Sequence, residues 1–239
     1  MSILAVDKLS KNFRGLAAIA DVSFAIEQGS ITSIIGPNGA GKSTLFNLVT
    51  GYLAPTAGEV SFKGQRITNL ATNRIAELGV ARAFQIARPF RDLTVADNVR
   101  IGALFGKKGP RDVTATTQKS LELAALADLA SQPANTLTVG QLRHLEVARA
   151  IATRADLLLA DEPCAGLNPT ETAAMIEVLR QVRASGVTVV LVEHDMPSVM
   201  EVSDRLLVLD AGRLIADGAP HEVARDPKVI AAYLGTPET

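Results

Sequence analysis

The feature that most constrains the fold is a glycine-rich segment between a β-branched apolar run, residues 30–35, and a helical pattern, residues 42–50. The segment matches the pattern G-x-x-x-x-G-K-[ST] and reads Gly36-Pro37-Asn38-Gly39-Ala40-Gly41-Lys42-Ser43-Thr44. Glycines let successive backbone N–H groups face one anion, and a helix that starts there adds its positive end. The pattern therefore predicts a strand, a phosphate-binding loop and a helix, rather than an ordinary glycine-rich turn.

Two side chains of this loop suit a metal–triphosphate complex. Lys42 is spaced to reach the β- and γ-phosphates, and the Ser43 hydroxyl is placed to ligate Mg²⁺. We therefore expect ATP and Mg²⁺ as ligands.

A second strand ends in a pair of carboxylates. The apolar run Leu157-Leu158-Leu159-Ala160 is followed directly by Asp161 and Glu162. Burying two acids without a partner is costly, and a Mg²⁺ ion with a triphosphate is a suitable partner. We expect Asp161 to hold the metal and Glu162 to polarise the attacking water. The alternative is a strand that surfaces into a loop.

The pattern along the chain changes twice. Short strands and turns occupy the first part, including two strands within 4–26 and a hairpin around Lys63-Gly64. Helical spacing takes over at 85–149, with one helix at 95–104, apolar positions Leu121, Leu126 and Leu129 on another, and a third from about Thr138. Strands and helices then alternate, with strands at 156–159, 187–192 and 205–209 and a helix at 169–184. We predict a single α/β unit with a core of 1–84 and 150–239 and a helical subdomain of 85–149.

Composition excludes several classes of function. Hydrophobic residues make up 47% of the chain, with few aromatics and no Trp, which indicates an aliphatic core. The net charge of −1 gives no basic surplus, so no nucleic-acid partner is expected. No apolar run approaches the ~20 residues that span a bilayer. Any membrane role is therefore expected to come through a partner, with the chain in the cytoplasm.

Taken together, these motifs resemble the ATP-binding subunits of ABC transporters. The most discriminating match is to the LSGGQ signature of that family, here Leu137-Thr138-Val139-Gly140-Gln141. Thr replaces Ser and Val replaces the first Gly, although Thr138 keeps a hydroxyl for the γ-phosphate. The alternative role of Thr138 is a helix N-cap, and the two roles are compatible.

The resemblance assigns further residues. Gln85 matches the glutamine that touches Mg²⁺ and the attacking water, and His194 matches the histidine that contacts the γ-phosphate. Phe13 lies where the family places an aromatic ring against adenine, although a core Phe is common. The segment that follows the carboxylates matches the D-loop, Ala165-Gly166-Leu167-Asn168. Asn168 stands where many relatives have Asp, and it is also suited to cap the helix that begins at Pro169.

The resemblance also implies an architecture and an assembly. The expected fold is a P-loop NTPase core of the RecA type, with an antiparallel β-subdomain and an inserted α-helical subdomain. ATP is expected to lie between two ATPase subunits, each completing the site of the other with its signature motif in trans. The two subunits can be identical or different.

Within the family, the chain most resembles the ATPases of branched-chain amino acid importers. The matching segments are 83–85, 90–95, 165–169 and the C-terminal part from Asp226 to Gly235, whereas the segment between Phe105 and Leu121 is shorter than in that group. This implies permease subunits at the inner face of the membrane and, indirectly, an extracellular or periplasmic substrate-binding protein. The expected cargo is a branched-chain or other hydrophobic amino acid, or a related amide. The alternatives are a lipopolysaccharide exporter ATPase, a soluble ABC ATPase outside transport, and a regulator without turnover, although that last class is expected to lack Glu162 or His194.

Overall fold

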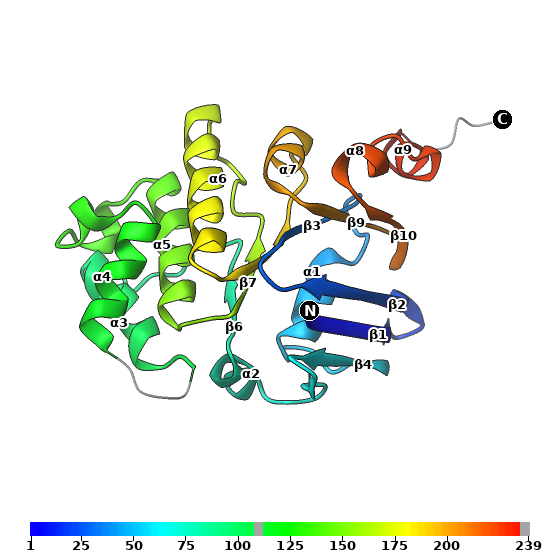
Figure 1. Cartoon of the computed structure of the whole chain (residues 1–239), viewed down its shortest axis with the longest axis horizontal. Coiled ribbons are helices and arrows are strands. Elements are labelled where there is room, and N and C mark those ends of the chain that lie inside the picture. The colour runs from blue at the N-terminus through cyan, green and yellow to red at the C-terminus, as the bar shows by residue number, and fades with distance from the viewer. Residues whose placement is uncertain (108–111, 235–239) are drawn as a thin grey trace. The chain divides into compact units, whose positions relative to one another are not determined.

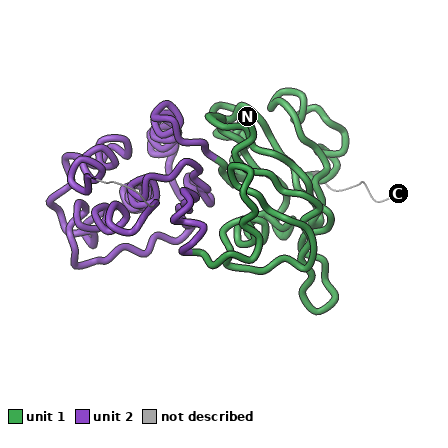
Figure 2. The backbone as a smooth tube through the Cα atoms, turned by 60° about the horizontal axis from the view of Figure 1, so that its bottom comes forward, with its two compact units in different colours: residues 1–72, 190–239 green, residues 73–189 purple. Residues whose placement is uncertain are grey.

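The computed structural model describes residues 1–107 and 112–234. They form two compact units, Met1–Thr72 with Val190–Thr239 and Asn73–Val189, which Figure 2 shows in different colours. The chain passes between the units after Thr72 and within strand β8 (Thr188–Val192). The division into a core of 1–84 and 150–239 with a helical subdomain of 85–149 stays a prediction.

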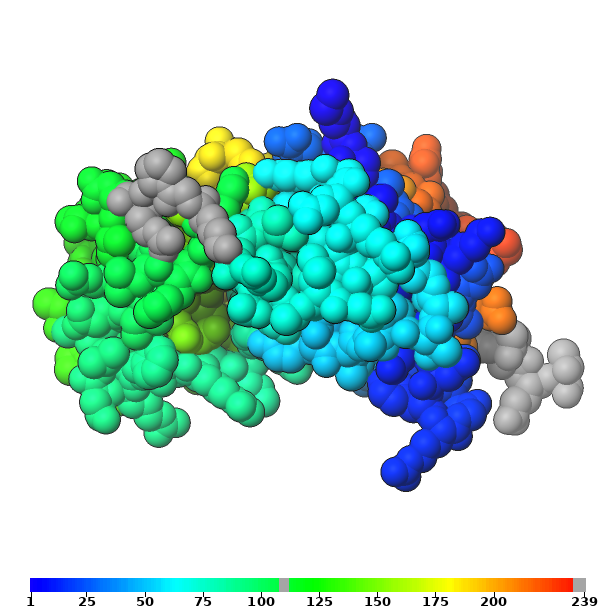
Figure 3. All heavy atoms as spheres, turned by 90° about the horizontal axis from the view of Figure 1, so that it is seen from below, coloured from blue at the N-terminus to red at the C-terminus, as the bar shows by residue number. Residues whose placement is uncertain are grey.

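The first unit contains an antiparallel sheet with the strand order β2-β1-β4-β5 (Figure 1). Its strands are β1 (Ser2–Phe13), β2 (Leu16–Glu27), β4 (Ala57–Phe62) and β5 (Gln65–Arg66). The turn between β1 and β2 consists of Arg14 and Gly15, both with positive φ, as a tight hairpin turn requires. This turn stands out from the surface in blue in Figure 3. The strands predicted within 4–26 and the hairpin at Lys63-Gly64 are confirmed.

A second group of strands in the same unit carries the glycine-rich loop. β3 (Ile31–Ile35) runs parallel to β9 (Arg205–Asp210), and β10 (Arg213–Gly218) pairs antiparallel with β9. All five residues of β3 are buried, and the loop joins β3 to helix α1 (Lys42–Val49). The remaining helices of the unit are α7 (Met196–Val202), α8 (Pro220–Val223) and α9 (Pro227–Leu234).

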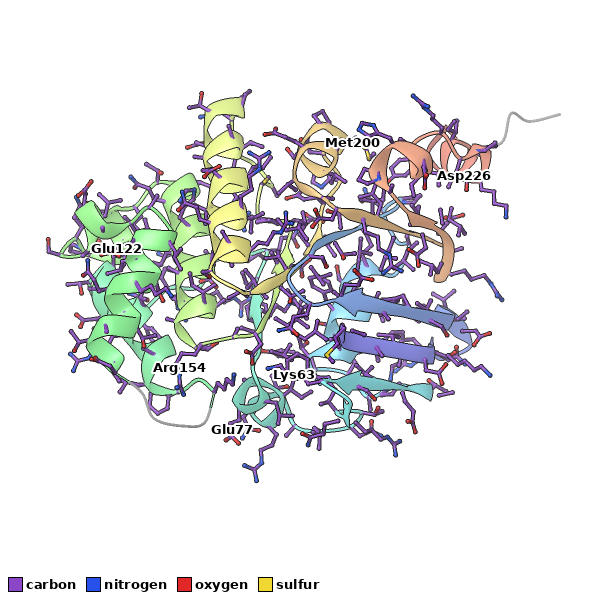
Figure 4. The ribbon with its side chains drawn as sticks, in the orientation of Figure 1. Lys63, Glu77, Glu122, Arg154, Met200 and Asp226 are labelled. Carbon is purple, nitrogen blue, oxygen red and sulfur yellow. The ribbon has the colours of Figure 1, made fainter. Side chains whose placement is uncertain are left out.

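One apolar cluster links these elements to the start of the loop. Ile35 of β3, Val199 of α7, Val208 of β9 and Val229 of α9 are buried in it, and Met200 packs against it from α7 (Figure 4). Ile35 directly precedes Gly36, so the cluster anchors the point where the loop begins.

The second unit is mostly helical. Its parallel strands are β6 (Val80–Ala83) and β7 (Leu157–Asp161), and α2 (Thr72–Leu78) precedes β6. Its longer helices are α3 (Val95–Leu104), α4 (Val113–Leu123), α5 (Val139–Ala152) and α6 (Pro169–Ala184). Helices α3, α4 and α5 lie side by side around one buried aliphatic cluster (Figure 1). The predicted helices at 95–104 and 169–184 have the observed bounds.

The prediction of one helix with an apolar side at Leu121, Leu126 and Leu129 is wrong in extent. Helix α4 ends at Leu123, and Ala125 then takes a positive φ of 54°. Leu126 precedes a short 3₁₀ turn that ends at Leu129, yet both side chains still join the α3–α4–α5 cluster. The sequence also predicts that the run Lys107-Lys108-Gly109-Pro110 breaks the helical pattern after 95–104, and all of this run except Lys107 lies outside the described residues.

Candidate nucleotide site

Two glycines of the loop have no room for a side chain. A Cβ atom on Gly36, at φ +148°, would lie 2.0 Å from the carbonyl oxygen of Leu209. A Cβ atom on Gly41, at φ +105°, would lie 2.6 Å from the carbonyl oxygen of Ala18. The loop therefore packs directly against the backbone of β9 at Leu209 and of β2 at Ala18. Gly41 precedes α1 without a side-chain cap, which leaves the N–H groups of the first helical turn to face an anion.

Lys42 is held within the loop. Its side chain donates to the carbonyl oxygens of Gly36, at 2.6 Å, and of Pro37, at 2.9 Å. The residue is only 8% exposed, so its ammonium group is a buried positive charge beside the loop.

The turn between β9 and β10 supports the loop from behind. The N–H of Gly212 donates to the carbonyl oxygen of Ala40, at 3.0 Å, and the carbonyl oxygen of Gly212 accepts from the N–H of Ala20, at 2.8 Å. Gly212 has a φ of +77°, and a Cβ there would lie 2.8 Å from the carbonyl oxygen of Ala18. This turn therefore joins the antiparallel sheet to the loop.

His194 and Phe13, the other residues predicted in the first unit, are both exposed. His194 follows β8, and the next residue, Asp195, caps α7 by accepting from the N–H of Ser198 at 3.0 Å. Hydrogen bonds from the Ser198 hydroxyl and N–H lower the pKa of the Asp195 carboxyl, and His194 adds a smaller effect in the same direction. Phe13 is 43% exposed, with the Lys11 ammonium 5.1 Å from its ring centroid.

The carboxylate pair lies at the end of β7 in the second unit. Asp161 is 6% exposed, and its Oδ2 accepts from Nη2 of Arg82 at 2.5 Å. Glu162 follows in the left-handed region, at φ +48°, where a non-glycine residue is uncommon. Its Oε2 accepts from Nε2 of Gln85 at 2.5 Å. The structure thus brings together Asp161, Glu162 and Gln85, as expected, and adds Arg82, which the sequence analysis missed.

The signature segment and the D-loop segment meet at two helix starts. Thr138 caps α5 in a reciprocal pair with Gln141, and Asn168 caps α6 in a reciprocal pair with Glu171. A Cβ on Gly140 would lie 2.9 Å from Oε1 of Glu171, so only glycine packs there without displacing that side chain.

A hydrogen bond joins helix α5 to the D-loop segment. Nη2 of Arg143 donates to the carbonyl oxygen of Ala165 at 3.3 Å. The caps predicted at Thr138 and Asn168 are both confirmed. Val139, which directly follows Thr138, is 59% exposed and faces solvent.

The predicted residues fall in both compact units. The glycine-rich loop, Phe13 and His194 belong to the first, and the carboxylates, Gln85, the signature and the D-loop belong to the second. Among the described residues, no three His, Cys, Asp or Glu side chains cluster as a metal site. The side chains predicted to hold the metal, Ser43, Gln85 and Asp161, carry a hydroxyl, an amide oxygen and a carboxylate. These are donor types that suit Mg²⁺, which commonly binds one or two carboxylates together with substrate phosphates.

Comparison with known proteins decides the family. The family described as ABC transporter matches residues 19–165. The chain is 39% identical to the high-affinity branched-chain amino acid transport ATP-binding protein BraF of Pseudomonas aeruginosa, over 98% of both chains. The chain belongs to the ABC transporter family. This cassette is also 37% identical to the LivG protein of Escherichia coli, again over 98% of both chains.

Solved structures agree with the fold of the cassette. A nucleotide-free ATP-binding cassette from an ABC transporter superposes with a TM-score of 0.89 at 32% identity, over 99% of this chain and 100% of that one. A dimeric cassette in a post-hydrolysis state, bound to ADP and Pi, superposes with a TM-score of 0.80 at 25% identity, over 91% of this chain and 98% of that one. The predicted P-loop NTPase fold is confirmed, and the chain is an ATP hydrolase coupled to transport.

The C-terminal part of the cassette carries a second match. Residues 213–239 match the family described as branched-chain amino acid ATP-binding cassette transporter. The resemblance to the branched-chain amino acid subfamily is thereby confirmed. Within the described part of the chain, no helix is both long and apolar enough to cross a membrane.

Proposed function

We propose that the cassette energises uptake of a branched-chain or other hydrophobic amino acid, or a related amide. The observation that carries this proposal is the match of residues 213–239 to branched-chain amino acid cassettes, within a chain that aligns to such proteins over its full length. Membership of the ABC transporter family accounts for ATP hydrolysis. The match of the C-terminal part limits the proposed cargo to hydrophobic amino acids and related amides.

Hydrolysis in this proposal uses the predicted residues in distinct roles. Residues 36–44 wrap the phosphates, and Lys42 transfers its donors from the loop carbonyls to the β- and γ-phosphates. Ser43, Gln85 and Asp161 supply oxygen donors to Mg²⁺, which neutralises phosphate charge when bound. Glu162 orients and polarises the attacking water, His194 contacts the γ-phosphate, and Phe13 stacks on adenine.

The second half of each site comes from another subunit in this proposal. In the second unit, Gly140 of the signature lies against Glu171 of α6, and Arg143, two residues after the signature, donates to the carbonyl oxygen of Ala165 in the D-loop. Val139 is exposed there, so the segment is available to a partner. Dimeric cassettes of similar fold support this arrangement. The partner is a second ABC ATPase, either an identical copy or a different one.

We propose that permease subunits attach the cassette to the membrane. Several large apolar side chains between residues 84 and 105 are exposed on the second unit, namely Phe84, Ile86, Phe90, Leu93, Leu104 and Phe105. Such a concentration of apolar side chains is typical of a protein contact. We place the cassette at the inner face of the membrane, held by permease subunits that receive cargo from a binding protein outside.

Reconstitution tests the cargo. The cassette is to be co-expressed with permeases and a binding protein of the branched-chain amino acid type, and the complex placed in liposomes that contain ATP and Mg²⁺. We expect uptake of labelled leucine, isoleucine or valine that ceases when Glu162→Gln replaces the wild type. Lipopolysaccharide extraction without amino acid uptake would contradict the import proposal, and purification only with nucleic acid would place the chain outside transport.

A further inference from the structure

The buried ion pair between Arg82 and Asp161 is not explained by the predicted motifs. Their side chains are 8% and 6% exposed, and Nη2 of Arg82 lies 2.5 Å from Oδ2 of Asp161. A buried charge pair stabilises a fold only when its hydrogen-bond geometry is good, because removing both charges from water costs free energy. The pair lies at the end of β7, beside the carboxylate proposed for catalysis.

Strand register explains how Arg82 reaches this carboxylate. β6 and β7 are parallel, and Arg82 pairs with Leu159. Paired residues of neighbouring strands point to the same face, and so do residues two apart on one strand. Asp161 is therefore the diagonal neighbour of Arg82 on that face, within reach of a long side chain.

Further contacts fix the guanidinium and its surroundings. The Phe84 ring centroid lies 4.9 Å from the guanidinium carbon of Arg82, within the range of a cation–π contact. Three residues after Arg82, Gln85 donates to Glu162. The segment 82–85 thus holds the carboxylate proposed to bind the metal and the one proposed for catalysis, each through a hydrogen bond from a different side chain.

We infer that Arg82 is a positioning residue for the nucleotide-bound metal: it grips one oxygen of Asp161 and so presents the other, Oδ1, to Mg²⁺. This inference rests on the proposed role of Asp161. A carboxylate has lone pairs on both oxygens, so it can accept from the guanidinium and serve the metal at the same time. Groups that orient a metal ligand in this way commonly change metal affinity 10–100-fold when they are removed.

Metal affinity separates positioning from a purely structural role. The full chain is to be titrated with Mn²⁺ in the presence of a non-hydrolysable ATP analogue, with bound Mn²⁺ followed by electron paramagnetic resonance. We expect Arg82→Gln to raise the Mn²⁺ midpoint roughly 10–100-fold, and Arg82→Lys, which keeps the charge, to raise it less. Analogue binding in EDTA, where no metal contributes, should stay at the wild-type level for both variants.

Two controls sharpen the measurement. Arg66→Gln removes an arginine from an exposed pair with Glu59, 61% and 52% exposed, and should leave the Mn²⁺ midpoint unchanged. Asp161→Asn should weaken Mn²⁺ binding by itself. Arg82→Gln should then add nothing to the loss of Mn²⁺ affinity in the Asp161→Asn background, because the inferred effect of Arg82 on the metal passes through that carboxylate.

The outcomes are distinguishable. An unchanged midpoint in folded Arg82→Gln, with a normal loss in Asp161→Asn, would overturn the inference and leave the proposed function intact. An unchanged midpoint in Asp161→Asn would remove Asp161 from its proposed role and the inference with it. Unfolding of both Arg82→Lys and Arg82→Gln would assign Arg82 to the fold alone and likewise overturn the inference.

Discussion

At the scale of single residues, the proposed catalytic positions lie where the backbone is least ordinary. Glu162 holds a φ of +48° directly after a buried strand, a conformation that costs a non-glycine residue about 1–3 kcal/mol. At this φ the Glu162 side chain departs from the alternating side-chain directions of β7, and its carboxylate lies beside Gln85. Strain of this kind persists where the surroundings fix it, and here the contact with Gln85 contributes.

Removing the charge of Glu162 should stop turnover without stopping binding. Glutamine is close in size to glutamate, so Glu162→Gln can keep a contact with Gln85 but cannot accept a proton. We expect ATP hydrolysis to fall by at least about 10²-fold, with ATP affinity unchanged, as measured by phosphate release and equilibrium binding. The matched control is Glu177→Gln on α6, at an exposed position. Wild-type turnover in Glu162→Gln would remove Glu162 from its proposed role.

The glycine-rich loop offers a test of close packing. In Gly36→Ala the new Cβ would lie 2.0 Å from the carbonyl oxygen of Leu209, so the loop must shift. In Gly39→Ala the Cβ meets nothing within 4 Å, although φ is also positive, at +82°. We expect Gly36→Ala to lose more ATP affinity and more thermal stability than Gly39→Ala, by calorimetry and thermal melting. Equal losses would show that the effect of alanine comes from the positive φ and not from the clash with the carbonyl oxygen of Leu209.

Sequence could predict residues whose roles depend on spacing along the chain. The loop 36–44 and the pair Asp161-Glu162 follow from short patterns that phosphate and metal chemistry require. Arg82 does not, because its role depends on the register between β6 and β7, and the 73 residues 84–156 separate these strands along the chain. A charged residue within the otherwise apolar run 80–83 was the only local sign.

At the scale of elements, two reciprocal caps define the start of α5 and of α6. In the second, Oδ1 of Asn168 accepts from the N–H of Glu171, and Oε2 of Glu171 accepts from the N–H of Asn168, both at 3.0 Å. Both caps were predictable, because a cap depends on neighbours three residues away. The early end of α4 was not, because apolar spacing continues through Leu126 and Leu129 while Ala125 turns the backbone.

The cap at Asn168 should be measurable as stability. Asn168→Ala removes the side-chain acceptor, and we expect the free energy of unfolding to fall by about 1 kcal/mol. Asn168→Asp keeps an acceptor and should retain the wild-type value, even though it restores the acid that many relatives carry. Urea denaturation followed by circular dichroism gives both values. Equal stability of Asn168→Ala and the wild type would show that the cap contributes nothing.

At the scale of the whole molecule, the C-terminal part is tied to the loop. Val229 of α9 shares a buried cluster with Ile35, which precedes Gly36. Asp226 accepts from the N–H of Lys228 at the start of this helix (Figure 4). Burial raises the pKa of the Tyr233 phenol, and a hydrogen bond from the Gly36 N–H opposes that rise. The segment that matches the branched-chain amino acid subfamily therefore also supports the phosphate loop.

If each subunit completes the site of the other, two variants that are inactive alone should complement each other when they are mixed. Lys42→Met disables the loop but keeps the signature. Gly140→Asp keeps the loop but disables the signature, because a Cβ at this position would lie only 2.9 Å from Oε1 of Glu171. Each variant alone should hold no ATP between subunits. A dimer of one Lys42→Met chain and one Gly140→Asp chain, however, has one intact site. The loop of the Gly140→Asp chain and the signature of the Lys42→Met chain form it.

Mixing the two variants in the Glu162→Gln background should therefore restore trapped ATP. With random pairing, half of the dimers are mixed and each has one intact site of two, so recovery of roughly one quarter of the parent level is expected for a symmetric dimer. Trapped nucleotide is counted after size-exclusion chromatography, with unmixed variants as controls. Folded variants that recover nothing would show that two copies of this chain do not complete each other's sites, whereas recovery only with a second, different ATPase would identify the pair as a heterodimer.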